Sequence, residues 1–229
     1  MPTFKCNDAG PAPGFFHAMM RAFVVAGALI AAPAVFADGL SDLDAFLRQT
    51  QQGKADFTQT VTPPKKAGET SARVKNSRGV FEFQRPNRFR FQYTQPFEQT
   101  IVADGQTLWL FDVDLNQVTA RRQQDVLANT PAGLIASAAD SKALNQVFAL
   151  SNGADADGLQ WVLATPKAKD GTLQQVRLGF RQGQLAALEM LDSFGQRSVI
   201  QFGAMNNQPG FKAGHFSFTP PVGADVVRQ

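Results

Sequence analysis

Two adjoining stretches of this chain alternate between aromatic and polar side chains across residues 79–94. Phe81 and Phe83 alternate with glutamate and glutamine in the first stretch, and Phe89, Phe91 and Tyr93 alternate with polar residues in the second. Successive side chains of a β-strand point to opposite faces, so each stretch is expected to be a strand with one aromatic and one wet face. The pattern predicts an antiparallel hairpin whose aromatic face is either packed core or the lining of a cavity.

The two aromatic sets share one face only in certain registers of that hairpin. We expect Phe83 to lie opposite Phe91, which leaves residues 86–88 in the loop and places Arg85 opposite Phe89. Arg85 then has the same parity as the phenylalanines. A guanidinium that leads out of an apolar face is costly unless acceptors take its hydrogen bonds. Arg85 is therefore either bound to a nearby acceptor or an ordinary surface cation.

Strand-like runs recur along most of the chain at intervals of about eight to twelve residues, which is typical of a β-sandwich or β-barrel. One amphipathic helix is expected before them, over Leu40–Thr50, with Ser41 as its N-cap. Residues 63–77 contain two prolines and four basic residues and are expected to form a long solvated loop. The expected strands are Lys54–Thr62, Gly79–Arg85, Arg88–Thr94, Gln99–Ala103, Gln106–Val113, Gln117–Arg121, Leu159–Thr165, Leu173–Arg181, Gln184–Leu191, Ser198–Phe202 and His215–Thr219.

The N-terminal part of the chain has the pattern of an export signal. Arg21 precedes an almost uninterrupted apolar run over residues 22–35, and small residues stand at the −3 and −1 positions of a site after Ala37. A transmembrane anchor is the alternative, but the run is shorter than the roughly 20 residues that span a membrane. We expect an N-terminal extension with a cleavable signal peptide over residues 1–37, and a single domain over residues 38–229 that is exported to the periplasm.

The composition argues against several classes of protein. Charged residues make up 18% of the chain and the net charge is +3, without a dense Lys/Arg stripe, so no nucleic-acid partner is expected. Cleavage after Ala37 would remove Cys6 and His17 and leave one histidine, His215, and no cysteine. Such a chain lacks the residues for a disulfide framework or a His/Cys metal site, and we expect no cofactor and no metal.

Residues 129–139 interrupt the β pattern. Their first three, Asn-Thr-Pro, are typical of a helix start, with the threonine as cap and the proline in the first turn. We expect a short helix that plugs the mouth of a barrel, turns Leu134 and Ile135 inward and offers backbone carbonyls to Arg85. The alternative is that these two side chains only pack the helix onto the sheet.

These features occur together with a series of motifs spread over the whole expected domain. Their order and short gaps make the series more specific than any single motif. The motifs are Asp56–Gln59, Arg85–Phe89, Thr94–Pro96, Val102–Phe111, Asn129–Pro131, Thr165–Lys167 and Phe216–Pro221. Through them the chain resembles the periplasmic outer-membrane lipoprotein carrier family, LolA.

The resemblance implies a fold and a function. The family's fold is mainly β with short α-helices, an incomplete (open) antiparallel β-barrel with a helical lid over a hydrophobic cavity. Its members take acylated lipoproteins from an inner-membrane lipoprotein-releasing ABC transporter and pass them to an outer-membrane receptor lipoprotein, LolB. The family's lid-latching arginine corresponds to Arg85 and its cavity phenylalanine to Phe89. We expect the acyl-chain cavity to be lined by Phe81, Phe83, Phe89, Phe91, Tyr93, Trp109, Phe111, Leu134 and Ile135.

Some of these residues and the function itself have a second interpretation. Leu108–Phe111 is apolar at both parities, so one face of this run must be packed core, and Trp109 either contacts the cavity or is structural. A periplasmic carrier or sensor of another lipid on the same fold is also compatible, because an apolar cavity has little chemical selectivity. An enzyme is not expected, since His215 lies in a strand-like run and no glycine-flanked serine accompanies it. We expect the protein to act as a monomer.

Overall fold

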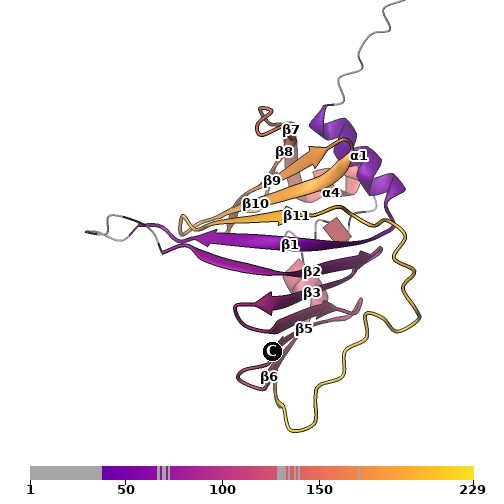
Figure 1. Cartoon of the computed structure of the whole chain (residues 1–229). Coiled ribbons are helices and arrows are strands. Elements are labelled where there is room, and N and C mark those ends of the chain that lie inside the picture. Colours follow the sequence, from indigo (N-terminus) through magenta and orange to yellow (C-terminus); the bar gives the residue numbers. More distant parts are fainter. Residues whose placement is uncertain are drawn as a thin grey trace, which may run out of the picture. The chain divides into compact units, whose positions relative to one another are not determined.

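Strands make up most of the structure, as the alternating sequence patterns predict (Figure 1). The computed structural model describes residues 38–65, 68, 71, 73–127, 133, 135–136, 138, 140–169 and 171–229. The expectations for residues 1–37, including the signal peptide and its cleavage site, lie outside the described residues. So do those for Asn129, Thr130, Pro131 and Leu134 in the expected lid helix.

The strands of the described chain form one sheet in the order β12-β6-β5-β4-β3-β2-β1-β11-β10-β9-β8-β7. Neighbouring strands are antiparallel except β12, which runs parallel to β6. The sheet ends at β12 and β7 instead of closing on itself, so the expected open, mainly antiparallel β architecture is confirmed. The strands are β1 Gln52–Thr62, β2 Lys75–Gln84, β3 Arg88–Gln95, β4 Gln99–Ala103, β5 Thr107–Asp112, β6 Gln117–Arg122, β7 Phe148–Asn152, β8 Gln160–Pro166, β9 Leu173–Arg181, β10 Gln184–Asp192, β11 Arg197–Phe202 and β12 Asp225–Arg228.

The helices that can be described beside the sheet are α1 Gly39–Gln49, α2 Gln123–Leu127 and α4 Ser141–Val147, and residues 133, 135 and 136 are also helical. Helix α1 packs against β7–β10 and lies across one end of the sheet (Figure 1). The expected helix Leu40–Thr50 is thus present, but its N-cap is Asp38 rather than Ser41. The Asp38 side chain accepts a hydrogen bond from the backbone N–H of Ser41, which is the third residue inside the helix.

The β2–β3 hairpin has a register two residues away from the expected one. Phe83 pairs with Phe89 rather than Phe91, and residues 85–87 form the loop. Asn87 adopts a left-handed conformation (φ 63°), which asparagine tolerates better than most residues and which can end a three-residue hairpin loop. Registers that differ by two residues present the same faces, so alternation alone could not distinguish them.

Three other boundaries differ from the expectations. The loop expected over residues 63–77 is shorter, because β2 already begins at Lys75, opposite Val61 of β1. Residues 215–219 form a turn and irregular backbone instead of a strand. Strands β7 and β12 were not expected, since each has only four or five residues, too few for alternation to be evident.

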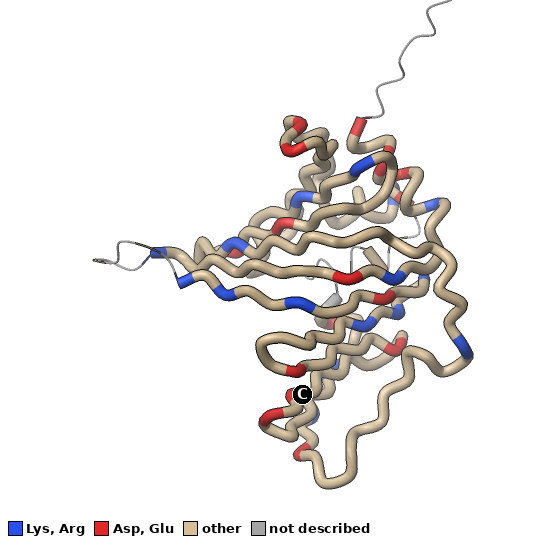
Figure 2. Tube along the Cα trace, viewed as in Figure 1, with Lys and Arg blue, Asp and Glu red and all other residues tan. Residues whose placement is uncertain are grey.

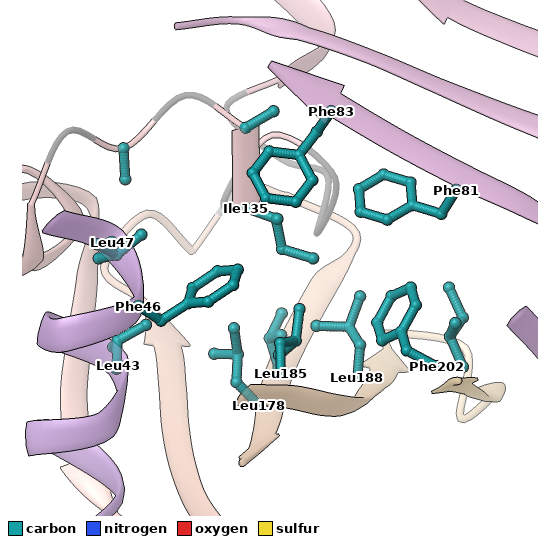
Figure 3. Close-up of a cluster of buried hydrophobic side chains, with 14 of the residues drawn as sticks. Leu43, Phe46, Leu47, Phe81, Phe83, Ile135, Leu178, Leu185, Leu188 and Phe202 are labelled. Carbon is teal, nitrogen blue, oxygen red and sulfur yellow. The ribbon is translucent and has the colours of Figure 1, made fainter. Parts of the chain in front are cut away.

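The main hydrophobic core lies on the concave side of the sheet, between the strands and α1 (Figure 3). Phe81 and Phe83 of β2 point into it from one side, and Leu185, Leu188 and Phe202 from the other half of the sheet. The segment that follows β11 runs along the convex side before it reaches β12, with Phe218 packed against Trp109. The two sides of the sheet are therefore covered by different parts of the chain.

Candidate functional site

The aromatic face expected from residues 79–94 lies on the concave side of the sheet. Phe81, Phe83, Phe89 and Phe91 are each at most 5% exposed. The ring centroids of Phe81 and Phe91 are 4.4 Å apart, and Phe81 stacks on Phe83 at 5.7 Å. The structure thus brings these four side chains together in one continuous apolar surface.

Two further phenylalanines extend this surface across the neighbouring strands. Phe57 of β1 contacts Phe91 edge-on at 5.4 Å, and Phe202 of β11 lies 5.5 Å from Phe81. Phe57 and Phe202 are cross-strand partners. Neither residue was among the expected cavity residues, although Phe57 alternates with Asp56 and Thr58 in the same way as the phenylalanines of the hairpin.

An apolar cover lies over the aromatic face. Leu43, Phe46 and Leu47 of α1 are buried in the same cluster, together with Ile135 of the expected lid. The ring of Phe46 is 6.1 Å from Phe83 and 5.9 Å from Phe180 (Figure 3). Ile135, an expected cavity residue, is 1% exposed. The aromatic face is therefore sealed by side chains that are not part of the sheet's hydrogen-bond ladder.

Arg85 connects the loop of the hairpin to the end of α1. Its Nη1 donates hydrogen bonds to the backbone oxygens of Thr50 at 2.8 Å and Leu47 at 3.3 Å. Carbonyls at a helix C-terminus lack partners within the helix and are free to accept them. The guanidinium also lies 5.1 Å from the ring centre of Phe46 and 5.3 Å from that of Phe83. Burial lowers the pKa of Arg85 to about 10, so the group stays charged at neutral pH.

The acceptors expected for Arg85 were carbonyls of the lid helix, whereas its described acceptors belong to α1. Its Nε and Nη2 atoms are buried and have no partner among the described residues. Asn87, two residues further along the loop, makes the described link to the lid segment, since its backbone N–H donates to the oxygen of Ala136 at 2.9 Å. Gln123 of α2 in turn donates through Nε2 to the oxygen of Asn87 at 2.6 Å. Sequence reasoning missed both Asn87 and Gln123.

Tyr93 lies where the aromatic face becomes polar. Its ring packs edge-on against Phe57 at 5.1 Å and stacks on Phe91 at 6.2 Å. Its hydroxyl donates a hydrogen bond to Oε1 of Gln59 at 2.9 Å. Burial raises the pKa of Tyr93 to about 12. Tyr93 thus belongs to the aromatic surface through its ring and to a polar region through its hydroxyl.

Trp109 and Phe111, which were expected in the cavity, lie on the opposite face of the sheet. Trp109 pairs with Val102, on the parity opposite to Phe89 and Phe91, and both aromatic rings pack against Phe218. The alternation could not assign this strand because it is apolar on both sides. Its concave face is formed by Leu108, which packs against the core cluster.

His215 has structural partners on the convex face. Its Nε2 lies 2.8 Å from Oε2 of Glu82, and its ring stacks on Phe211 at 4.4 Å. Lys54 also reaches Glu82, with Nζ 3.0 Å from Oε1. These contacts attach the segment after β11 to β2 and account for the position of the histidine without a catalytic role.

Residues 48–219 match the family described as "Outer membrane lipoprotein carrier protein LolA". The chain belongs to the LolA family. Over 197 residues it is 60% identical to the outer-membrane lipoprotein carrier protein of Albidiferax ferrireducens, covering 84% of this chain and 92% of the relative. It is 47% identical over 205 residues to that of Methylibium petroleiphilum, covering 90% and 97%. A solved structure of a LolA superfamily protein from Nitrosomonas europaea is similar at TM-score 0.45 and 16% identity, over 78% of this chain and 96% of that one.

For this LolA-family member, the chemistry of the site is that of apolar contact. Among the described residues, no group of three or more His, Cys, Asp or Glu side chains could hold a metal ion. In the same part of the chain, no helix is long and apolar enough to cross a membrane. The aromatic face offers area without hydrogen-bonding demands, and the polar groups next to it are Arg85 at one end and Tyr93 at the other.

Proposed function

We propose that this chain is a periplasmic chaperone that shields the acyl chains of lipoproteins. In this proposal it accepts them from the inner-membrane ABC transporter that releases lipoproteins. It then carries them across the periplasm and delivers them to the outer-membrane receptor lipoprotein LolB. Its membership of the LolA family and the printed names of its relatives support the cargo class. The export-signal pattern expected over residues 1–37 supports the compartment.

The single observation that carries the proposal is the aromatic face beneath the cover formed by α1 and Ile135. An acyl chain of about fifteen methylenes costs on the order of 12 kcal/mol to leave in water, at about 0.8 kcal/mol per methylene. A carrier must therefore offer a large apolar surface. Phenylalanine suits this task because it offers area without a hydrogen-bonding group that needs a partner. The buried phenylalanines of β1, β2, β3 and β11 form such a surface.

The attachment of the cover supports a cycle of opening and closing. Helix α1 and Ile135 occupy the place over the aromatic face that acyl chains would take. The hairpin loop holds α1 by two hydrogen bonds from one atom of Arg85 and by ring contacts with that side chain. Acyl chains that bind the open form better than the closed form shift the population towards it, and their release lets the cover return.

The proposal is tested by incubating purified protein with spheroplasts that contain a labelled outer-membrane lipoprotein. We expect the labelled lipoprotein to appear in the soluble fraction in a complex with this chain. We also expect it to move to liposomes only when these contain LolB. Absence of the complex, or transfer to liposomes without LolB at the same rate, would overturn the proposal.

Transport of a different lipid on the same fold is the competing outcome. Native mass spectrometry of the protein purified from the periplasm separates the two functions. Bound triacylated lipoprotein supports the proposal. Bound phospholipid or glycolipid, with no lipoprotein, would instead indicate that the protein carries or senses that lipid.

A further inference from the structure

The concave face changes from apolar to polar at the same level on five neighbouring strands. The inward-facing side chain is polar two residues beyond Phe57, Ile101 and Leu110, and four residues beyond Phe81. On β3 the corresponding residue is Tyr93, and on β1 the apolar Val61 follows Gln59. Cross-strand pairing places several of the polar residues side by side, since Gln59 pairs with Ser77, and Gln99 pairs with both Tyr93 and Asp112. The polar level consists of Gln59, Ser77, Tyr93, Gln99 and Asp112.

These five residues line a pocket of about 670 Å³ at the end of the sheet away from α1. Its volume falls in the range of roughly 300–1,000 Å³ that is typical of small-molecule sites. Phe97 and Leu115 stand on its rim and are each 70% exposed. The pocket therefore combines polar side chains with an apolar rim and adjoins the aromatic face.

The floor of the pocket is held in place by a chain of hydrogen bonds. The hydroxyl of Tyr93 donates to Oε1 of Gln59, and Nε2 of Gln59 donates to Oγ of Ser198 at 2.8 Å. The side chains of Ser77 and Gln99 are half-buried and have no hydrogen-bond partner in the described part of the chain. Half-buried polar groups of this kind are available to bind the polar part of a ligand.

The charges around the pocket select the kind of polar group that fits. Among the described residues, its lining contains one cation, Lys75, and two carboxylates, Asp112 and Asp114. Figure 2 shows that the turn between β5 and β6 is acidic. An anionic headgroup such as a phosphate would meet like charge there, whereas neutral amides, esters and hydroxyls would not. The pocket therefore fits an amphiphile with apolar tails and a neutral hydrogen-bonding head.

We propose that this pocket binds the neutral linkage at the N-terminus of the cargo, namely the glyceryl thioether, the acylated cysteine amide and the first peptide units. The acyl chains would lie on the aromatic face, and Phe97 and Leu115 would contact the peptide as it leaves the protein. This inference rests on the proposed function, since it assigns the head of the same ligand. It gives the protein a means of preferring lipoproteins over anionic phospholipids with the same acyl chains.

The experiment compares two ligands of the full-length mature protein. The neutral dye 1-N-phenylnaphthylamine reports on the aromatic face alone, and a tripalmitoyl-glyceryl-cysteine tetrapeptide reports on the face and the pocket together. We expect Gln99→Leu and Ser77→Val each to lower the ratio of lipopeptide affinity to dye affinity about fivefold to tenfold, because each removes a hydrogen-bonding group from the pocket. Gln92→Leu, on the convex face of β3, is the matched control and leaves the ratio unchanged.

A second measurement tests the charge argument. Dipalmitoylphosphatidylglycerol is expected to bind at least tenfold more weakly than the lipopeptide, and Asp112→Asn is expected to narrow that difference. The Asp112 side chain also accepts a hydrogen bond from the backbone N–H of Leu115, which asparagine can still accept. Equal binding of the two ligands by the wild type, or an unchanged ratio in both pocket variants, would overturn this inference while the proposed function stands. Failure of the wild type to bind the lipopeptide at all would instead count against the proposed function.

Discussion

Nη1 of Arg85 lies 2.8 Å from the backbone oxygen of Thr50, and this contact joins the loop of the β2–β3 hairpin to the end of α1. The same guanidinium lies close to one ring of the cover, Phe46, and one ring of the sheet, Phe83. Its Nε and Nη2 atoms remain without partners among the described residues. Within the described part of the chain, Arg85 thus attaches the cover to the sheet through one of its three guanidinium nitrogens.

Arg85→Leu is expected to weaken the closed form by about 2 kcal/mol, since the variant loses charge-assisted hydrogen bonds to two backbone oxygens. The open, loaded form would then persist, and transfer of cargo to LolB-containing liposomes would slow. Denaturant unfolding and the transfer assay measure the two effects. Arg88→Leu is the matched control, because the neighbouring Arg88 is exposed. Normal transfer by the Arg85 variant would show that this contact does not control delivery.

Trp109 and Phe91 allow the two faces of the sheet to be tested separately. Phe91→Ala is expected to lower affinity for 1-N-phenylnaphthylamine about fivefold, because it removes part of the concave aromatic surface. Trp109→Ala is expected to destabilise the fold by about 2 kcal/mol through its lost contact with Phe218, with unchanged dye affinity. Fluorescence titration at a temperature where both variants are folded gives the comparison. A loss of dye affinity in the Trp109 variant equal to that in the Phe91 variant would contradict the assignment of faces.

Local patterns predicted most of the strands and the aromatic face, whereas the open barrel was implied by the resemblance to the LolA family. Period-two alternation places Phe81, Phe83, Phe89 and Phe91 on one side in both the expected and the observed register, because these differ by two residues. The register itself depends on the loop, where Asn87 takes a left-handed conformation that alternation does not reveal. A similar ambiguity explains Trp109, because a strand that is apolar on both sides carries no parity signal.

Long-range contacts were beyond the reach of the sequence. Nothing in the local pattern relates Glu82 to His215, which are far apart in the chain and meet on the convex face. Nor does it show that Arg85 reaches the end of α1, since the expected partner was the helix after residue 129. The polar pocket could not be predicted for the same reason, because its five residues come from five strands and become neighbours only through the register of the sheet.

Glu82→Gln is expected to lower the free energy of unfolding by about 2 kcal/mol at pH 7. The substitution replaces the buried carboxylate, which binds Lys54 and His215, by a neutral amide that binds them more weakly. Burial alone would raise the pKa of Glu82, but the hydrogen bonds from His215 and Lys54 outweigh it and hold the pKa below its ordinary value of 4.5. Because the pKa is lower in the folded state, the ionised carboxylate stabilises the fold fully at pH values above the ordinary pKa. This stabilisation is lost as the pH falls through the lowered pKa.

Urea unfolding of both proteins between pH 7 and pH 3 checks this prediction. The difference between wild type and Glu82→Gln should shrink on acidification, because the wild-type carboxyl then becomes protonated as well. The exposed Glu98 provides the control variant Glu98→Gln, for which little difference is expected at any pH. A difference for Glu82→Gln that stays constant down to pH 3 would show that the ionised carboxylate does not stabilise the fold.

Tyr93 is the one tyrosine of the chain, so its ionisation can be followed by the absorbance of tyrosinate without interference from another phenol. Burial raises its pKa to about 12, and we expect a titration midpoint near that value in the folded protein and near 10.0 in urea. Because the folded-state pKa is the higher one, this group's contribution to stability is complete below pH 10 and is lost as the pH rises towards 12. Gln59→Leu, which removes the hydroxyl's acceptor but not the ring's packing, should leave most of the shift in place. A folded-state midpoint near 10 would place the Tyr93 hydroxyl in open solvent and remove it from the polar end of the concave face.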